Sequence, residues 1–226
     1  MLEAVAESVR QVTTPQAIVA ALGRRDDTSR AILLVGGAAF TETERLEALR
    51  RLFATLAGYL ERTGTAVVDG GTDSGVMRLM ADARTAIGGS FRLVGVAPIG
   101  AFERTTRAGD PIRVAPDHSV VFLVPGSEFG DEMPWLFFAA DHLAGGAAPT
   151  IVVNGGRLSR EEARARLFAG HRVVTVAGSG RAADELAEDA ALEDLRASGR
   201  LRVIPLDADE AALSAAIEGQ PEDSEG

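Results

Sequence analysis

The chain has 226 residues, of which 46% are hydrophobic and 25% charged, so it can bury a full core as one large domain or two small ones. Its formal net charge of −10 argues against a general affinity for nucleic acid or anionic membranes, because a basic surface supplies most of that attraction. All 23 basic residues are arginine and cysteine is absent, which excludes a Schiff-base lysine, the lysine of a Walker loop and a cysteine-ligated metal.

The N-terminal segment, residues 1–30, is amphipathic and is predicted to form a helical extension outside the sheet. It carries Glu3 and Glu7 where a signal peptide would carry basic residues. No apolar run approaches the ~20 residues that a membrane helix needs. We therefore expect a cytoplasmic protein that has neither a membrane nor a nucleic acid as its partner.

Short β-rich segments then alternate with longer segments of helical periodicity, a pattern typical of a parallel α/β sheet. Most of these strands are almost continuously apolar, as strands covered on both faces should be. The predicted strands are 31–35, 65–69, 92–97, 119–124, 150–154, 172–177 and 201–206. The sequence predicts a single doubly wound, Rossmann-like three-layer sandwich over residues 1–219, with a mostly parallel sheet of about seven strands and a disordered tail at 220–226.

Three connecting segments carry signals of their own. The helix predicted over 43–63 ends at Gly64, a plausible C-terminal cap. Ser159 with Glu162 three residues later forms a capping-box pattern, which predicts that a helix begins there. Residues 98–117 are rich in proline and arginine where a crossover helix is expected, so they are predicted to form a long ordered loop, a kind of segment that is often functional.

Four glycine-rich turns follow predicted strands. In a doubly wound sheet the ligand crevice lies beyond the carboxyl ends of the strands, and a helix that starts there offers unpaired N–H groups to an anion. One such turn alone would be only a tight connection, but four in one sheet favour a ligand site. The turns are "VGGAAF" with Gly36 and Gly37, "DGGTDSGVM" with Gly70, Gly71 and Gly75, "VPGSEFGDE" with Gly126 and Gly130, and "VAGSGRAAD" with Gly178 and Gly180.

Polar side chains accompany two of these turns. Oxygens of Thr72, Asp73 and Ser74 at a helix start can cap the helix or bind a ribose hydroxyl. Arg181 enters the first helical turn behind the fourth pair of glycines and adds a guanidinium that suits phosphate. The fourth turn also approaches the dinucleotide fingerprint, but it lies late in the chain, so a hydride-transferring dehydrogenase is not expected.

Other reactive residues give weaker signals. Glu128, Asp131 and Glu132 form an acidic cluster that could serve acid–base chemistry, clamp a ribose or simply be a solvated loop. The three histidines have no metal-ligand spacing, and no metal site is expected. The apolar helix predicted from residue 133 is either core or a homo-oligomer face.

Six motifs in chain order resemble the SLOG superfamily, and most closely the prokaryotic relatives of the cytosolic N-terminal domain of melastatin-type TRP channels. The motifs are "VGGAAF", "VVDGGTDSGVMRLMADA", "GVAPIGAFER", "PDHSVVFLVPGSEFG", "PTIVVNGGRLS" and "VVTVAGSGRAADELA". The resemblance covers residues 31–187. It implies a Rossmannoid fold that senses or processes nucleotide-derived ligands such as ADP-ribose and NAD derivatives, in several cases within bacterial conflict systems.

The resemblance also implies which residues touch the ligand, with no cofactor required beyond the nucleotide itself. These are Gly36, Gly37, Ala38, Gly70, Gly71, Thr72, Asp73, Ser74, Gly75, Val76, Met77, Arg104, Gly126, Ser127, Glu128, Gly178, Ser179, Gly180 and Arg181.

The enzymatic branch of the same superfamily, the cytokinin-activating phosphoribohydrolases, has a signature of the form P-G-G-x-G-T-x-E-E. The corresponding loop here is "PGSEFGDEM", in which Ser127 replaces the second glycine, Asp131 replaces threonine and only Glu132 matches the acidic pair. These departures rank binding above catalysis.

Two functions therefore stay open, beside a scaffold that has kept the fold and lost its ligand. The first is a sensor of ADP-ribose, an NAD-related molecule or a cyclic nucleotide, which acts through an effector protein or through its homo-oligomeric state. The second is a nucleotide N-glycosidase with Glu128 or Glu132 as the catalytic residue.

Overall fold

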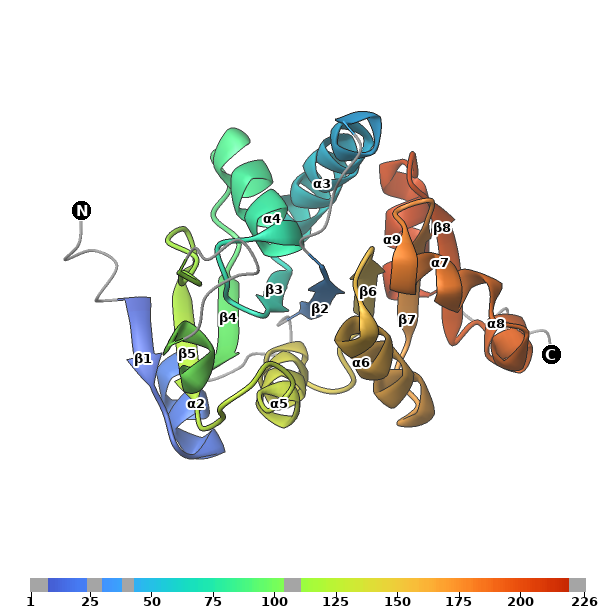
Figure 1. Cartoon of the computed structure of the whole chain (residues 1–226). Coiled ribbons are helices and arrows are strands. Elements are labelled where there is room, and N and C mark those ends of the chain that lie inside the picture. Colours follow the sequence, from blue (N-terminus) through green and yellow to red (C-terminus); the bar gives the residue numbers. More distant parts are fainter. Residues whose placement is uncertain (1–7, 24–29, 38–42, 104–110, 220–226) are drawn as a thin grey trace.

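The computed structural model describes residues 8–23, 30–37, 43–103 and 111–219. Its centre is one sheet of eight strands in the order β1-β5-β4-β3-β2-β6-β7-β8 (Figure 1). Every neighbouring pair is parallel, so the doubly wound α/β prediction is confirmed, with eight strands instead of about seven. The strands are β1 (Val9–Gln11), β2 (Ala31–Gly36), β3 (Ala66–Asp69), β4 (Leu93–Pro98), β5 (Val120–Val124), β6 (Thr150–Val153), β7 (Val173–Ala177) and β8 (Leu201–Pro205).

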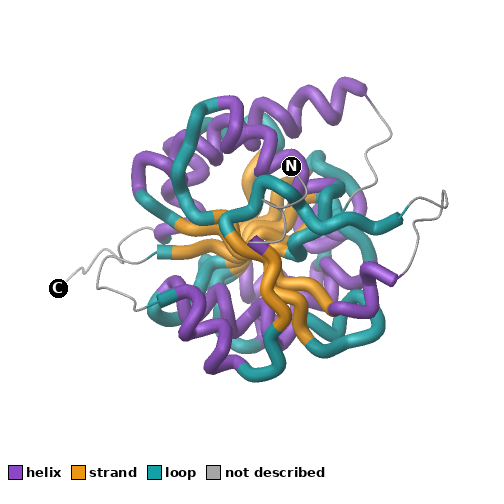
Figure 2. Tube along the Cα trace, turned by 90° about the vertical axis from the view of Figure 1, so that its left-hand side faces the viewer, coloured by secondary structure: helices purple, strands orange, loops and turns teal. Residues whose placement is uncertain are grey.

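Helices cover both faces of this sheet (Figure 2). The helices are α2 (Pro15–Leu22), α3 (Thr43–Thr63), α4 (Gly75–Ala86), α5 (Met133–Ala144), α6 (Arg157–Phe168), α7 (Arg181–Glu188), α8 (Glu193–Ala197) and α9 (Glu210–Glu218), with short 3₁₀ helices at Ile99–Glu103 and Ala190–Leu192. Side chains alternate along each strand, so Ile32 and Leu34 of β2 belong to the core cluster that includes α3, α4 and α9. Leu33 and Val35 belong to the cluster on the other face, which includes α2, α5, α6 and α7.

The strand order reverses at one point in the sheet. From β2 the chain adds β3, β4 and β5 on one side, and then it returns to place β6 on the other side of β2. The helices that follow β2 and β6 lie on opposite faces, so a crevice opens beyond the carboxyl ends of these two strands.

The structure corrects several local predictions. Val9–Gln11, which the sequence analysis assigns to a helical extension, pairs with β5 as the edge strand β1 and accounts for the eighth strand. The capping-box prediction is wrong, because α6 begins at Arg157 with Gly156 as its N-cap and Ser159 lies inside the first turn. Residues 98–117 contain a 3₁₀ helix and an isolated bridge from Val114 to Thr72, while residues 104–110 lie outside the described residues.

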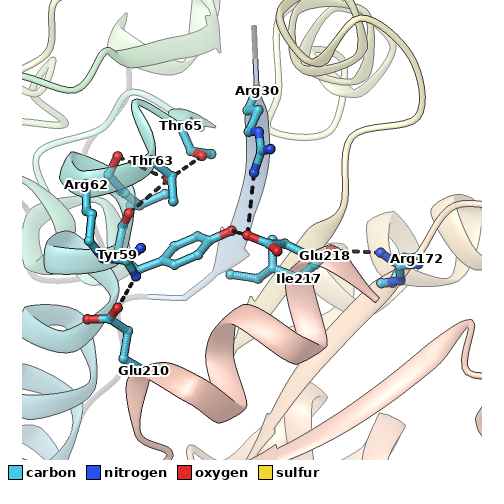
Figure 3. Close-up of polar contacts among 10 residues, drawn as sticks. Arg30, Tyr59, Arg62, Thr63, Thr65, Arg172, Glu210, Ile217 and Glu218 are labelled. Atoms are coloured by element: carbon cyan, nitrogen blue, oxygen red, sulfur yellow. Dashed lines mark hydrogen bonds and ion pairs between the residues drawn. The ribbon is translucent and has the colours of Figure 1, made fainter. Parts of the chain in front are cut away.

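The C-terminal helix α9 packs on one face of the sheet and ends at the amino edge, opposite the crevice. The Tyr59 hydroxyl of α3 donates to Glu218 Oε1 of α9 at 3.0 Å, and Arg172 donates to the carbonyl of Ile217 at 2.8 Å (Figure 3). Burial, reinforced by the bond to Glu218, raises the pKa of Tyr59 to about 12, so the phenol stays a donor. These contacts hold α9 against α3 and the start of β7.

Candidate functional site

A cavity of about 380 Å³ lies in the crevice at the carboxyl edge of the sheet. Its walls come from the end of β2, the β3–α4 turn, the start of α5 and the start of α6. The polar side chains on the walls belong to Thr72, Ser74, Glu132, Arg157, Ser159 and Glu162. Of the predicted ligand residues, Gly36, Gly70, Thr72, Ser74 and Met77 line it.

Glycines at the ends of β2 and β6 let the two turns meet backbone to backbone. A Cβ atom on Gly37 would lie 3.0 Å from the Cα of Gly155, and one on Gly36 would collide with the carbonyl oxygen of Val153. This close packing explains why glycine occurs at these positions even without a ligand.

The N-terminus of α4 opens on the cavity. Ser74 is the N-cap but makes no side-chain capping bond, and the first intrahelical bond is from Arg78 N to Ser74 O. Within the described residues, the N–H groups of residues 75–77 therefore have no acceptor. These groups form an anion site of the kind the sequence predicts at this turn.

The N-terminus of α6 opens on the cavity from the other face of the sheet. Gly156 is the N-cap without a side-chain bond, and Arg160 N to Gly156 O is the first bond of the helix. Across the described parts of the chain, no acceptor reaches the N–H groups of residues 157–159. Sequence analysis did not assign this turn, although the signal was present as Asn-Gly-Gly directly after an apolar strand.

The rest of the β3–α4 turn is held by its neighbours. Asp69 Oδ1 accepts from Gly71 N at 2.8 Å and lies 2.8 Å from His118 Nε2, and both side chains are fully buried. The N–H group of Asp73 donates to the carbonyl of Arg113, and its carboxylate pairs with Arg78. Asp69 and His118 thus fix the turn, a role that sequence reasoning missed for Asp69.

The third turn satisfies its own backbone. Asp131 Oδ2 accepts from the N–H groups of Ser127 at 2.8 Å and Glu128 at 3.1 Å. These bonds lower the pKa of Asp131 and keep it ionised. Because the carboxylate occupies these two N–H groups, an incoming anion would have to displace it. Glu128 is exposed and Gly126 packs against Asp131, away from the cavity walls.

The fourth turn supports the β6–α6 turn from behind. Ser179 is fully buried, and its Oγ accepts from Asn154 N at 2.8 Å while donating to Val176 O. The N–H groups of Ala182 and Ala183 donate to the carbonyls of Gly155 and Asn154, so the start of α7 has lost much of its anion-binding capacity.

Arg181 reaches the edge of the site from this fourth turn. Its guanidinium lies beside Gly156, where a Cβ atom would be 2.9 Å from Nη2. Arg181 and Asn154 have φ angles of 52° and 55°, a conformation rare for residues other than glycine and a mark of strain at functional sites. Arg181 also lines a second cavity of about 240 Å³ together with Arg157 and Arg160.

Two buried carboxyl groups share the main cavity. Glu132, the N-cap residue of α5, is 6% exposed and Glu162 of α6 is 8% exposed. Glu132 accepts from Gly130 N at 2.6 Å, and burial raises its pKa. Burial, together with repulsion from Glu132 and Glu161, raises the pKa of Glu162 to about 8. Glu162 can therefore carry a proton at neutral pH beside Glu132 in the cavity.

Two predicted ligand residues, Ala38 and Arg104, lie outside the described residues. No group of three or more histidine, aspartate or glutamate side chains placed to hold a metal ion occurs in the described part of the chain. Likewise, none of the described helices is long and apolar enough to cross a membrane.

Solved structures with the same arrangement share low sequence identity with this chain. The protein TM1055, from a structural genomics programme, is 20% identical with a TM-score of 0.58, over 84% of this chain and 99% of its own. The molybdenum cofactor binding protein from Rippkaea orientalis is 13% identical with a TM-score of 0.55. The molybdenum cofactor carrier protein from Chlamydomonas reinhardtii is 18% identical with a TM-score of 0.55, and both matches cover 84% of this chain and 96% of theirs. A search of curated proteins gave no match.

The fold and the crevice define a Rossmann-like protein of the ligand-binding class. Residues 30–215 match the family described as "SLOG in TRPM, prokaryote". The chain belongs to this family, and the resemblance drawn from the six motifs is confirmed.

Proposed function

We propose that the cavity binds a phosphate-bearing nucleotide ligand of the class of ADP-ribose, an NAD-related molecule or a cyclic nucleotide. One observation carries this proposal: the open N-termini of α4 and α6 face the same cavity from opposite sides of the sheet. Each offers unpaired N–H groups and a partial positive charge, which offset the acidic net charge locally. A volume of about 380 Å³ suits a small molecule.

We place the protein among sensors in bacterial signalling or conflict. Ligand binding would change the contacts of the protein with an effector or with further copies of itself in the cytoplasm. Two of the similar structures are of proteins that bind or carry the molybdenum cofactor. This cofactor therefore belongs in any ligand panel beside the nucleotides.

Thermal melts against ADP-ribose, NAD, AMP, cyclic nucleotides and the molybdenum cofactor test the proposal. A ligand at 100 times its Kd adds about 2.7 kcal/mol, which raises the melting temperature by about 5–10 °C for a chain of this size. The proposal fails if no member of the panel shifts the melt.

A blocking variant ties any shift to the cavity. Gly70 lines it at a negative φ, and a Cβ atom there would touch only Met77 Cε at 3.9 Å. Gly70→Leu is therefore expected to fold and to fill the binding space. The matched control is Gly146→Leu, because Gly146 lies in a remote turn with open space around it.

The alternative is a nucleotide N-glycosidase, and the position of Glu132 favours it. Its carboxyl group is buried in the cavity, where it could stabilise charge that develops on a ribose. Release of free base from nucleoside monophosphates or NAD, abolished by Glu132→Gln, would support this activity. If the protein binds these nucleotides but shows no turnover at high enzyme concentration, the N-glycosidase is excluded and the sensor function remains.

A further inference from the structure

Glu162 is a buried carboxyl group for which the protein supplies no partner. It lines the cavity at 8% exposure, and in the described ranges no hydrogen bond or ion pair reaches its side chain. Glu132 faces the same space from α5, so the two carboxyl groups repel each other. Burying such a group costs stability unless it finds a hydrogen-bond partner. Its position in a ligand cavity indicates that the partner arrives with the ligand.

The chemistry of the pair limits what that partner can be. Glu162, whose pKa burial raises to about 8, can donate a hydrogen bond at neutral pH, and Glu132, whose Oε2 already accepts from Gly130 N, offers acceptor oxygens. A hydroxyl group suits both side chains, because it can accept from Glu162 and donate to Glu132. Two adjacent hydroxyl groups would satisfy the pair most completely.

The position of Glu162 along α6 fits a sugar phosphate. It lies five residues after Arg157, the first residue of the helix, which is about 7.5 Å along the helix axis at 1.5 Å per residue. A phosphate bound at the open N–H groups of α6 would therefore leave its sugar directed toward Glu162. The same ligand passes Ser159, which is 6% exposed and lines the cavity between them.

We propose that Glu132 and Glu162 together hold the 2′,3′-diol of the ligand's ribose, so that the cavity selects ribonucleotides over nucleotides that lack these hydroxyl groups. This inference rests on the proposed function, since the diol is placed relative to a phosphate at the helix N-termini. It adds a specificity-determining residue, Glu162, to which the sequence assigns only a place in a capping box.

The proposal carries a dependence on pH. The charged groups that act on Glu162 are Glu132 on α5 and Glu161 on α6, with Asp131 acting on Glu132 and Arg157 paired to Glu161. The neighbouring end of β2 carries no charge. When Glu162 ionises above about pH 8, it loses its donor and places a negative charge beside the anionic ligand.

Calorimetric titration with AMP, 2′,3′-dideoxy-AMP and pyrophosphate tests the proposal. The wild-type protein should bind AMP at least about tenfold more tightly than the dideoxy analogue, because hydrogen bonds to charged groups are lost with the diol. Glu162→Leu should reduce this ratio to within about threefold. Glu162→Gln keeps a donor and an acceptor, so this variant should still bind AMP more tightly than the dideoxy analogue. Because glutamine does not ionise, its affinity for AMP should not fall between pH 7 and pH 9 as that of the wild type does.

The outcomes separate this proposal from the proposed function. Equal binding of the two nucleotides, an unchanged preference in a folded Glu162→Leu, or binding of pyrophosphate without AMP would overturn the role of the diol and leave the anion site standing. If neither pyrophosphate nor any nucleotide binds, the anion site itself is refuted. If Glu162→Leu fails to fold, the proposal is tested by Glu162→Gln: an affinity for AMP that falls between pH 7 and pH 9 as in the wild type would overturn it.

Discussion

At the scale of single residues, the sequence predicts that Glu162 lies in a helix but not that its side chain is buried in the cavity. The capping-box pattern in the sequence places it three residues after a helix start at Ser159. In the structure the helix begins two residues before Ser159, and Glu162 lines the cavity at 8% exposure. Asn-Gly-Gly before the helix was the signal of the true start, since Gly156 serves as the N-cap.

Glu162 should make the protein less stable as the pH rises. Its pKa of about 8 in the folded state lies above the ordinary value of 4.5 for glutamate, so between these values the folded state holds a proton that the unfolded state has lost. The contribution is present in full below about pH 4.5 and declines toward pH 8, with a slope on the order of 1.4 kcal/mol per pH unit. Urea unfolding at pH 5, 6.5 and 8 measures it.

The matched variants are Glu162→Gln and Glu161→Gln. The first should flatten the slope and raise the free energy of unfolding at pH 8, because it removes a buried charge. Glu161→Gln changes an exposed side chain that is paired with Arg157, so the free energy of unfolding should still fall with pH as in the wild type. An unchanged slope in Glu162→Gln would contradict the burial of this carboxyl group.

At the scale of elements, the four predicted turns divide into different roles. The β3–α4 turn contributes an open helix N-terminus, whereas the third turn is closed by Asp131 and the fourth supports the β6–α6 turn through Ser179. The sequence predicts that all four lie at the carboxyl edge because each follows an apolar strand. It cannot tell which of them face the crevice, since that depends on β6 pairing with β2.

Ser179→Ala should loosen the β6–α6 turn. It leaves the buried N–H group of Asn154 without its acceptor, at a cost of about 1–3 kcal/mol. Ser198→Ala is the control, because that hydroxyl makes an exposed bond to Leu195 O and its loss should cost about 0.5 kcal/mol or less. Denaturant unfolding compares the two, and equal effects would argue against the supporting role of the fourth turn.

Arg166 joins the helices that carry the two cavity carboxyl groups. It is 1% exposed and binds both carboxylate oxygens of Asp141 on α5 as well as the carbonyl of Ala148. Arg166→Ala should lower the free energy of unfolding by about 3 kcal/mol. This value is at the lower end for breaking a buried ion pair, because the Asp141 side chain is 32% exposed.

The control for Arg166 is Arg160→Ala, which breaks an exposed pair with Glu185 and should cost less than about 1 kcal/mol. Thermal unfolding monitored by circular dichroism compares the two variants. Similar losses in both would show that the α5–α6 connection through Arg166 contributes little.

At the scale of the whole molecule, the fold class follows from the sequence because strands covered on both faces are continuously apolar. The edge strand β1 was missed, since three residues of which two are exposed carry no such pattern. The sequence predicts that the site lies at the carboxyl edge of the sheet. It does not predict the cavity, because the cavity depends on the strand order and on side-chain directions that motif spacing does not encode. The burial of Glu132 beside Glu162 is a property of the assembled layers alone.

The central claim is that a phosphate-bearing nucleotide occupies the cavity between α4 and α6. Calorimetric titration of ADP-ribose into the wild-type protein, Gly70→Leu and Gly146→Leu tests it most directly. ADP-ribose is expected to bind the wild type and Gly146→Leu and not to bind Gly70→Leu. Equal binding to all three proteins would contradict it, because the ligand would then lie elsewhere on the molecule.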